Sequence, residues 1–488
     1  MNAPDDEADV LDTGAAGGKA IRGGLLRTVA YGLTLVLGLV SVPLMTRHLG
    51  VVDYGYYVTV AAIAFIIGGF TEAGLTNLGV REYSALDGDE RTRYMRAIAG
   101  LRFVLTTAGV LIATGFAAIT GRPSVVVGGT AIVGLGLLLG LVQQTYAIPL
   151  TARLRFGWLS AIDVLKQVVL VGFIVGCVLA GTTLEPFFFA NVASGGAALL
   201  VTLWLVRSGG TALRPSFDLP RWRSILREVV PYALAAVAGL IYFRLGVLLL
   251  GSFGTDEEVG IYSTAFRIIE VVSALPFIAV SSAFPILARA ARDDADRLRY
   301  GIQRLFDGSV VFGLFLVVGL VVGARFAIEV IAPIDEFAAS VPVLRLQAVA
   351  VVFTFFVATF SFALLSLRRY RELLISNLAA VIIAAVGTPL LAPQMGAEGA
   401  ALATTLAEAT LSVAYAVALW RADPALLPHL GTVVRIAPAT VLAFAPMALD
   451  LHPVFEAALA GAVFVLAAVI ARAVPPELLN ALRRRDPG

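Results

Sequence analysis

The amino-acid sequence predicts an all-α integral membrane protein with about fourteen transmembrane helices, in two six-helix lobes around a central cavity plus two C-terminal helices. Of its 488 residues, 59% are hydrophobic and only 14% are charged, whereas soluble domains hold about 25% charged residues. Apolar segments of about 20 residues, the length that a helix needs to cross a bilayer, recur along the whole chain. Basic residues gather in every second connection between these segments, as they do on the cytoplasmic side of membrane proteins.

The amino terminus, residues 1–23, is expected to be a disordered cytoplasmic tail. Residues 1–18 contain five acidic residues and no basic residue, which is the opposite of a secretory signal peptide. Lys19, Arg22 and Arg27 then precede the first apolar segment, and basic residues beside a span favour the cytoplasmic side. The chain is therefore predicted to begin in the cytoplasm.

Residues 24–206 form the first predicted lobe. Its six apolar segments are residues 24–46, 55–78, 101–120, 124–146, 158–180 and 186–206. They are too long and too uniformly apolar for the strands of a membrane barrel, which alternate over about ten residues. Each segment is therefore expected to be a helix, which satisfies its own backbone hydrogen bonds in lipid.

A cytoplasmic linker, residues 207–228, is expected next, because two prolines and five arginines interrupt the apolar pattern. The second predicted lobe, residues 229–420, has six further segments: 229–250, 260–287, 305–327, 338–367, 373–391 and 397–420. Residues 421–488 are expected to add two helices, 434–449 and 454–471, and a basic cytoplasmic tail. Most of the 36 basic residues then lie in connections on one side of the membrane, which places both termini in the cytoplasm.

The two lobes are expected to be related by an internal repeat. Residues 49–57 (LGVVDYGYY), after the first span, resemble residues 254–262 (GTDEEVGIY), after the seventh. Because each lobe has an even number of spans, both insert in the same orientation. Such repeats are typical of alternating-access transporters.

Four short motifs carry a resemblance to a known family. They are residues 43–50 (PLMTRHLG) with 53–55 (DYG), residues 72–75 (EAGL) with 81–82 (RE), residues 258–265 (EVGIYSTA) and residues 396–403 (GAEGAALA). In this order they resemble the first-loop, second-helix, eighth-helix and twelfth-helix patterns of the polysaccharide-export family. That family consists of lipid-linked oligosaccharide flippases within the multidrug/oligosaccharidyl-lipid/polysaccharide exporter superfamily.

The resemblance implies a transporter and not an enzyme, with no catalytic residue and no cofactor. It would move a polyprenyl-diphosphate-linked oligosaccharide from the cytoplasmic to the outer leaflet of the cell membrane by alternating access, for cell-surface polysaccharide biosynthesis. The expected partners are this glycan, membrane lipid, polysaccharide-assembly proteins and a coupling ion, H+ or Na+; no nucleic acid is expected. No metal site is predicted, since the three histidines are scattered and the single cysteine lies within a span.

Three alternatives remain open from the sequence. A peptidoglycan-precursor flippase also has fourteen spans and arginines in its cavity. A cation-coupled small-molecule exporter of the same superfamily would need a cavity richer in carboxylates than in arginines. A membrane glycosyltransferase or polymerase would need acidic or histidine residues on a sizeable outer loop, and the predicted outer loops are mostly short.

Four arginines are candidates for binding the diphosphate. Arg244, Arg267 and Arg345 lie about seven residues below the outer ends of their spans, which is about 10 Å deep in the membrane. Charges at such depth are costly and usually face a bundle interior or an aqueous cavity. Arg244 has no acidic residue one turn away, so another helix or the substrate must supply its anion. The fourth candidate, Arg47, lies at an outer span end and could equally anchor a headgroup.

Three carboxylates are candidates for coupling transport to an ion gradient. Glu270 and Glu408 are expected near the membrane midplane, and Glu72 toward the inner side of its span. Glu270 could instead neutralise Arg267, which precedes it by three residues on the same helix face. Other charges near span ends, among them Arg102, Lys166 and Arg325, are expected to extend to the interface.

Reporter fusions test the predicted orientation. Fusions at Asp89, Ser216, Ala295 and the carboxyl terminus should report the cytoplasm, because basic residues surround these positions. Fusions at Asp256 and Asp335, in acidic connections, should report the outside. A cytoplasmic signal from the Asp256 fusion would contradict the two-lobe arrangement.

Overall fold

The computed structural model of the chain describes residues 16–72, 74–207, 215–449 and 451–471. These residues form helices joined by short connections, and no strand occurs among them. Eleven of the described helices are long and apolar enough to cross a membrane. The prediction of an all-α fold with many transmembrane helices is therefore confirmed.

The chain divides into two compact units, Met1–Ile241 and Tyr242–Gly488. The helices of the first unit are α1 (Ala16–Glu72), α2 (Leu75–Ala85), α3 (Gly88–Ile119), α4 (Ser124–Ala152), α5 (Phe156–Leu179), α6 (Leu184–Arg207) and the first part of α7 (Leu219–Phe253). Residues 1–15 of the predicted tail and 208–214 of the predicted linker lie outside the described residues. Helix α1 includes the rest of the predicted tail, from Ala16, and α7 begins within the predicted linker, at Leu219.

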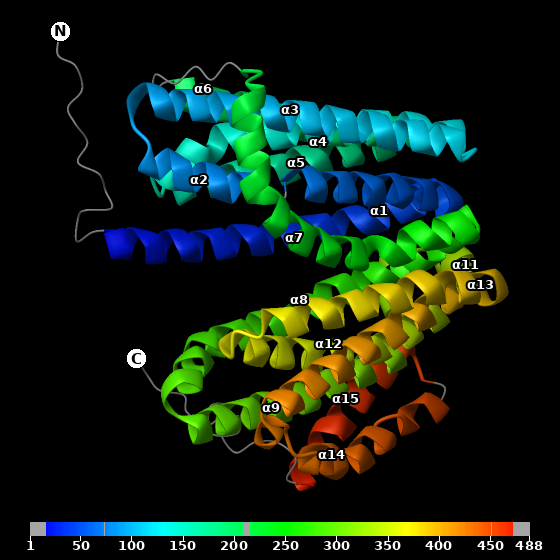
Figure 1. The fold of residues 1–488 in the computed structure, drawn as a ribbon. Helices are drawn as coiled ribbons and strands as arrows, with labels where there is room; N and C mark the ends of the chain where they lie inside the picture. Colours follow the sequence, from blue (N-terminus) through cyan, green and yellow to red (C-terminus); the bar gives the residue numbers. More distant parts are fainter. Residues whose placement is uncertain (1–15, 73, 208–214, 450, 472–488) are drawn as a thin grey trace. The chain divides into compact units, whose positions relative to one another are not determined.

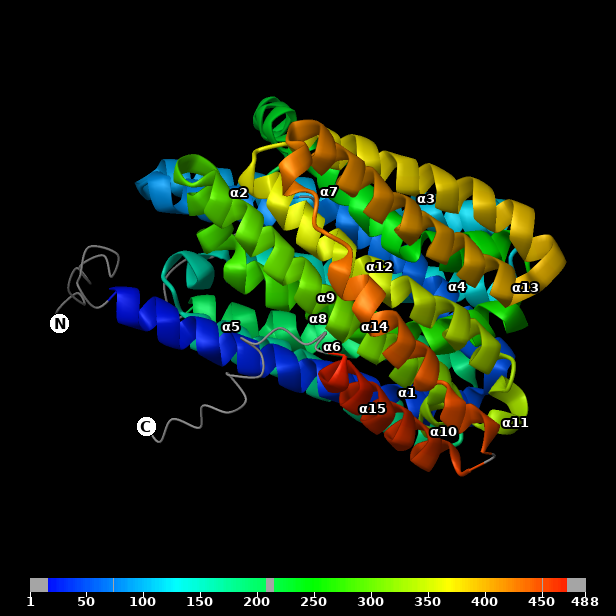
Figure 2. The same cartoon turned by 90° about the horizontal axis from the view of Figure 1, so that it is seen from below.

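The second unit contains the rest of α7 and all later helices (Figure 1). These are α8 (Asp256–Asp293), α9 (Ala295–Val322), α10 (Ala324–Ile331), α11 (Ile334–Phe337), α12 (Ser340–Ser366), α13 (Tyr370–Ala422), η2 (Pro424–Leu426), α14 (Gly431–Leu442), η3 (Ala445–Ala448) and α15 (Pro453–Ile470). Figure 2 shows α14 and α15 near α9, and buried side chains of all three belong to one hydrophobic cluster with α12 and α13. The predicted basic tail after residue 471 lies outside the described residues.

Two long helices each contain two of the predicted spans. Helix α1 has 57 residues and α13 has 53, and each is interrupted by one residue with non-helical dihedral angles. This residue is Gly50 in α1, with φ 72° and ψ −179°, and Gly396 in α13, with φ 57° and ψ −134°. Figure 1 shows both helices turning back on themselves, and a Cβ on Gly387 would lie 3.2 Å from Cβ of Ala403 in the other half of α13. Both glycines thus provide a tight reversal between consecutive spans.

Helix α8 begins with a complete capping box. The backbone N–H of Thr255 donates to the carboxylate of Glu258 at 2.7 Å, and the backbone N–H of Glu258 donates to the Thr255 hydroxyl at 3.2 Å. Two backbone donors that have no helical partner are thereby satisfied. A Cβ on Gly396 would contact the same Glu258 carboxylate, so this glycine also allows the reversal in α13 to approach the start of α8.

Within the first unit, connections predicted to share a side of the membrane contact one another. The Arg221 guanidinium at the start of α7 donates to the Glu90 carboxylate at the start of α3 at 2.8 Å. The ring Nε2 of His48, near the reversal in α1, lies 2.7 Å from the carbonyl oxygen of Thr182, between α5 and α6. These contacts group the connections as the predicted alternation requires.

The second unit has the same arrangement of contacts. The Arg299 guanidinium near the start of α9 donates to the Asp423 carboxylate after α13 at 3.3 Å. The backbone N–H of Ala425 and this guanidinium lower the pKa of the Asp423 carboxyl. Elsewhere in this unit, the Ser340 hydroxyl at the start of α12 donates to the carbonyl oxygen of Ile261 near the start of α8 at 2.9 Å.

Small residues allow close packing of α4 against α6. A Cβ on Gly136 of α4 would lie 2.6 Å from the backbone of Asn191 in α6, and one on Gly195 of α6 would lie 2.7 Å from the carbonyl oxygen of Gly136. Such approaches are typical of membrane helices, where close van der Waals contact drives association.

Replacing Gly396 should destabilise the second unit. Gly396→Ala forces a side chain into backbone angles that favour glycine and against the Glu258 carboxylate, at a cost of about 1–3 kcal/mol. The variant should therefore unfold at a lower temperature than the wild type in detergent. Gly319→Ala is the matched control, because Gly319 is helical and a Cβ there would meet no atom within 4 Å. Equal unfolding temperatures for the two variants would contradict this account of the reversal.

Candidate functional site

A three-residue charged cluster lies in the second unit. The Glu270 carboxylate on α8 accepts from Arg244 on α7 at 2.8 Å through Oε1, and from Arg267 on α8 at 2.9 Å through Oε2. The exposed fractions of the side chains are 11% for Arg244, 31% for Arg267 and 24% for Glu270. The cluster thus brings together two of the predicted diphosphate ligands and one of the predicted coupling carboxylates.

The local sequence explains how this cluster forms. Arg267 and Glu270 are three residues apart, so they lie on one face of α8. Arg244 has no acidic neighbour on α7, and its anion comes from α8, which is one of the two sources that the sequence left open. The Arg244 guanidinium also lies 5.9 Å from the ring centre of Phe266. Two guanidinium groups against one carboxylate leave one net positive charge on these three side chains.

Glu408 on α13 has a different environment in the same unit. The Tyr242 hydroxyl donates to its Oε1 at 2.9 Å, and the Thr354 hydroxyl lies 3.5 Å from its Oε2. No basic side chain of the described residues forms an ion pair with it. The carboxylate is therefore held by hydroxyl groups alone, unlike Glu270.

The other two candidate arginines have different surroundings. The Arg345 Nε donates to the carbonyl oxygen of Val321 at 3.2 Å, near the end of α9, and no described contact links Arg345 to Arg244 or Arg267. Arg47 is exposed and belongs to the first unit. A binding role for either residue stays a prediction.

In the first unit, Glu72 forms an ion pair with Arg102. The Arg102 side chain is completely buried, and its two terminal nitrogens also donate to the hydroxyls of Thr145 at 3.0 Å and Thr76 at 3.0 Å, and to the carbonyl oxygen of Leu141 at 3.1 Å. The expectation that Arg102 extends to the interface is therefore wrong. Sequence position placed it near a span end, but α3 begins thirteen residues earlier than the predicted span, at Gly88, so Arg102 lies well inside the helix.

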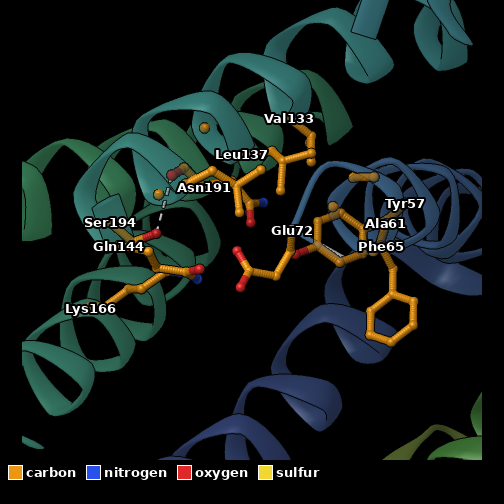
Figure 3. Close-up of a pocket in the computed structure, with 16 residues that line it drawn as sticks. Tyr57, Ala61, Phe65, Glu72, Val133, Leu137, Gln144, Lys166, Asn191 and Ser194 are labelled. Carbon is orange, nitrogen blue, oxygen red and sulfur yellow. Dashed lines mark hydrogen bonds between the residues drawn. The ribbon is translucent and has the colours of Figure 1, made fainter. Parts of the chain in front are cut away.

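A cavity of about 400 Å³ is lined in part by Glu72 (Figure 3). Its polar lining consists of Tyr57 and Glu72 from α1, Gln144 from α4, Lys166 from α5, and Asn191 and Ser194 from α6. Figure 3 shows the Glu72 carboxylate and the amides of Gln144 and Asn191 facing a common space. Lys166 therefore lines this cavity, and its extension to the interface stays a prediction.

Sequence reasoning did not single out Gln144, Asn191 and Ser194. All three are polar residues within long apolar segments, which was the available signal. That signal is weak because serine and amide side chains often form hydrogen bonds to neighbouring helices within a membrane bundle. Among the described residues, no group of three or more His, Cys, Asp or Glu side chains is arranged to hold a metal ion.

Comparison with known proteins gives one family match. Residues 20–291, more than half of the chain, match a family described as polysaccharide biosynthesis protein. A curated relative, the probable low-salt glycan biosynthesis flippase Agl15 of Haloferax volcanii, is 22% identical over 308 residues. This match covers 60% of the chain and 63% of the relative, so the chain spans less than two thirds of the relative's length.

Solved transporters share the fold. The lipid II flippase MurJ in an inward closed conformation has a TM-score of 0.72 and 13% identity, and the match covers 92% of this chain and 99% of that one. An inward-facing multidrug resistance MATE family transporter of the MOP superfamily has a TM-score of 0.58 and 13% identity, with 83% and 98% covered. Identities this low show a similarity of fold alone.

Removing Arg102 should destabilise the first unit. Arg102→Ala leaves the Glu72 carboxylate without its cation and three oxygen acceptors without their donor, which costs about 3 kcal/mol for a buried pair. The thermal unfolding temperature of the purified variant should fall clearly. The control is Arg325→Ala, which removes a 62% exposed arginine paired with Glu329 and should change stability by about 0.5 kcal/mol or less.

A double variant separates the ion pair from simple loss of packing. Arg102→Ala with Glu72→Ala should be more stable than the sum of the two single losses predicts, because no unpaired charge remains. Strict additivity would show that the pair contributes nothing beyond packing.

Proposed function

Because the chain belongs to the polysaccharide biosynthesis protein family, we propose that it is a flippase for a polyprenyl-diphosphate-linked oligosaccharide. It moves this lipid from the cytoplasmic to the outer leaflet of the cell membrane, for the biosynthesis of a cell-surface polysaccharide. The many apolar helices support a multi-pass membrane protein, and the fold shared with solved transporters supports a transport activity. The Haloferax relative, which is named as a probable glycan biosynthesis flippase, supports the glycan class.

The observation that carries the substrate class is the pair of arginines at Glu270. Arg244 and Arg267 direct their guanidinium groups at the two oxygens of one carboxylate, so they already bind an oxyanion from two sides. A diphosphate presents oxygens in a similar way and carries more negative charge. Guanidinium groups suit this ligand because each offers several donors in a planar fork.

While no diphosphate is bound, the Glu270 carboxylate pairs with the two guanidinium groups in its place. The cluster has partly exposed side chains within membrane-spanning helices, and charged groups at such positions usually face water and not lipid. When the diphosphate arrives it displaces the carboxylate, and when it leaves the carboxylate pairs with the arginines again. The empty transporter can then return without two unpaired cations in a membrane interior, which would be costly.

The two units act as the two lobes of an alternating-access mechanism. One lobe rocks against the other to open the substrate site to each side of the membrane in turn, while the prenyl chain stays in lipid. Both termini lie in the cytoplasm. No covalent step takes place, and the chain acts as a transporter and not as an enzyme.

Of the three candidate coupling carboxylates, Glu408 suits proton exchange best. Glu270 is paired with two arginines and Glu72 with one, so each already has a cation as its partner. Glu408 is held only by the hydroxyls of Tyr242 and Thr354, which can bond to either protonation state.

Of two alternatives, the exporter is less well supported, and the peptidoglycan-precursor flippase relies on the same chemistry. A cation-coupled small-molecule exporter would be favoured by a cavity richer in carboxylates than in arginines, whereas the cluster has two arginines and one carboxylate. A peptidoglycan-precursor flippase would use the same arginines for the same diphosphate, and only the glycan would differ. A transport assay with both lipids separates these cases.

Transport should depend on both arginines of the cluster. In proteoliposomes with a fluorescent polyprenyl-diphosphate-linked glycan, Arg244→Ala and Arg267→Ala should each lower the initial rate of glycan translocation by about ten-fold or more, since a charged hydrogen bond to the diphosphate is lost. Arg244→Lys should retain part of the rate, because the charge remains while the forked geometry is lost. The measurement is the fraction of glycan that becomes accessible to a lectin on the other side.

Arg325→Ala serves as the control, because this arginine is 62% exposed and lies outside the cluster. It should transport at the wild-type rate. Translocation by Arg244→Ala at the wild-type rate, in protein that is folded and inserted, would exclude the arginine pair as the diphosphate site. Translocation of no polyprenyl-diphosphate lipid by the wild type would exclude the proposed function.

A further inference from the structure

The cavity of the first unit has the size of a ligand site. Its volume of about 400 Å³ falls in the range of about 300–1,000 Å³ that is usual for small-molecule sites. Residues of α1, α4, α5 and α6 line it, among them Gly68 and Gly69 of α1 and Gly136 and Gly140 of α4. A Cβ on Gly140 would lie 3.5 Å from the Lys166 ammonium, so Lys166 reaches across to α4.

Two amide side chains on the cavity wall have no partner among the described residues. The amides of Gln144 and Asn191 make no hydrogen bond there with a side chain or backbone group, and Lys166 makes no hydrogen bond but interacts electrostatically with Asp163. Glu72 accepts from Arg102 through Oε2, and no described bond uses its Oε1. Unpaired polar groups inside a membrane bundle are costly, so a polar ligand or water must complete them.

The charges at the wall balance one another, which disfavours simple ions as ligands. Lys166 interacts electrostatically with Asp163 on α5, and Glu72 is paired with Arg102. Lysine is also rare in this chain, with Lys19 and Lys166 the only two lysines among 36 basic residues. What fits both charges and both amides is a neutral molecule with many hydroxyl groups, because each hydroxyl can donate and accept.

Aromatic side chains supply an apolar part of the wall. The Tyr57 ring stacks on Phe188, with ring centres 6.0 Å apart and planes 6° apart, so its position is fixed. Phe65 also lines the cavity. Sugars have apolar C–H faces beside their hydroxyl edges, and a wall with aromatic rings on one part and amides on another matches both.

We infer that this cavity binds a sugar unit of the transported glycan, through Gln144, Asn191, Lys166 and Glu72. This inference rests on the proposed function and adds a saccharide site to it, apart from the diphosphate contact of Arg244 and Arg267. The glycan then contributes to binding in its own right, and the first unit selects for it while the second unit selects for the diphosphate.

Binding of two lipids tests the inference. The probes are lipid-linked glycan extracted from the cells that make this protein, and polyprenyl diphosphate without glycan. The full-length purified chain should bind the glycan-bearing lipid at least ten-fold more tightly, measured by microscale thermophoresis. Gln144→Leu and Asn191→Leu should each reduce this ratio by about five-fold, the effect of one lost hydrogen bond, and should leave binding of polyprenyl diphosphate unchanged.

Two matched variants control the experiment. Gln394→Leu removes an exposed amide on α13, outside the cavity, and should leave the ratio unchanged. Arg267→Ala should weaken both lipids equally. Because the Gln144 and Asn191 amides have no partner in the part of the chain that the structure describes, their leucine variants should keep the wild-type unfolding temperature.

The outcomes separate this inference from the proposed function. Equal affinities of the wild type for the two lipids, or equal losses for both lipids in the leucine variants, would overturn the sugar site while leaving the diphosphate site standing. A wild type that binds neither lipid would overturn the proposed function itself. Unfolding of both leucine variants at clearly lower temperature would also overturn the inference, because the amides would then be structural.

Discussion

This structure depends on how each charged side chain inside the hydrophobic core of the membrane is neutralised. Most of each helix is hydrocarbon, so a charged side chain within it needs an ion partner, a hydrogen-bond network or water. Arg102 is fully buried and has the first two, through Glu72 and three oxygen acceptors. Arg244 and Arg267 share Glu270 and remain partly exposed, which is the arrangement expected of charges beside a water-filled space. The two groups of charges thus differ in burial, since Arg102 is enclosed by the protein and the cluster at Glu270 is still partly accessible.

In both units, a tyrosine near the start of the second span contacts the sixth span. In the first unit Tyr57 stacks on Phe188 of α6, and in the second unit Tyr262, its counterpart in the repeated motif, lies 3.1 Å through its hydroxyl from the Thr404 hydroxyl of α13. Each tyrosine therefore ties the second span of its unit to the sixth. The chemistry of the contact differs, stacking in one case and a hydrogen bond in the other, as expected when a repeat keeps its backbone arrangement and changes its side chains.

Glycine residues allow both the close packing of helices and the open space of the cavity. Gly136 has neighbours on two sides: its backbone allows α6 to approach, and it also lies on the wall of the cavity. Where a second backbone fills the space next to a glycine, helices associate tightly. Where no backbone does, as at Gly140 opposite Lys166, a polar cavity remains between helices that are otherwise well packed.

The sequence by itself determined the all-α membrane fold and the order of the apolar segments, because the length and apolarity of a segment decide whether it crosses a bilayer. It also identified Arg244, Arg267 and Glu270 as charges that need an explanation, since a charge in an apolar run is visible without coordinates. Only the tertiary structure decided which anion binds Arg244, that Arg102 is buried with Glu72, and that Gln144 and Asn191 face a shared cavity. The physical reason is that hydropathy reports depth along one helix, whereas pairing depends on which faces of separate helices meet.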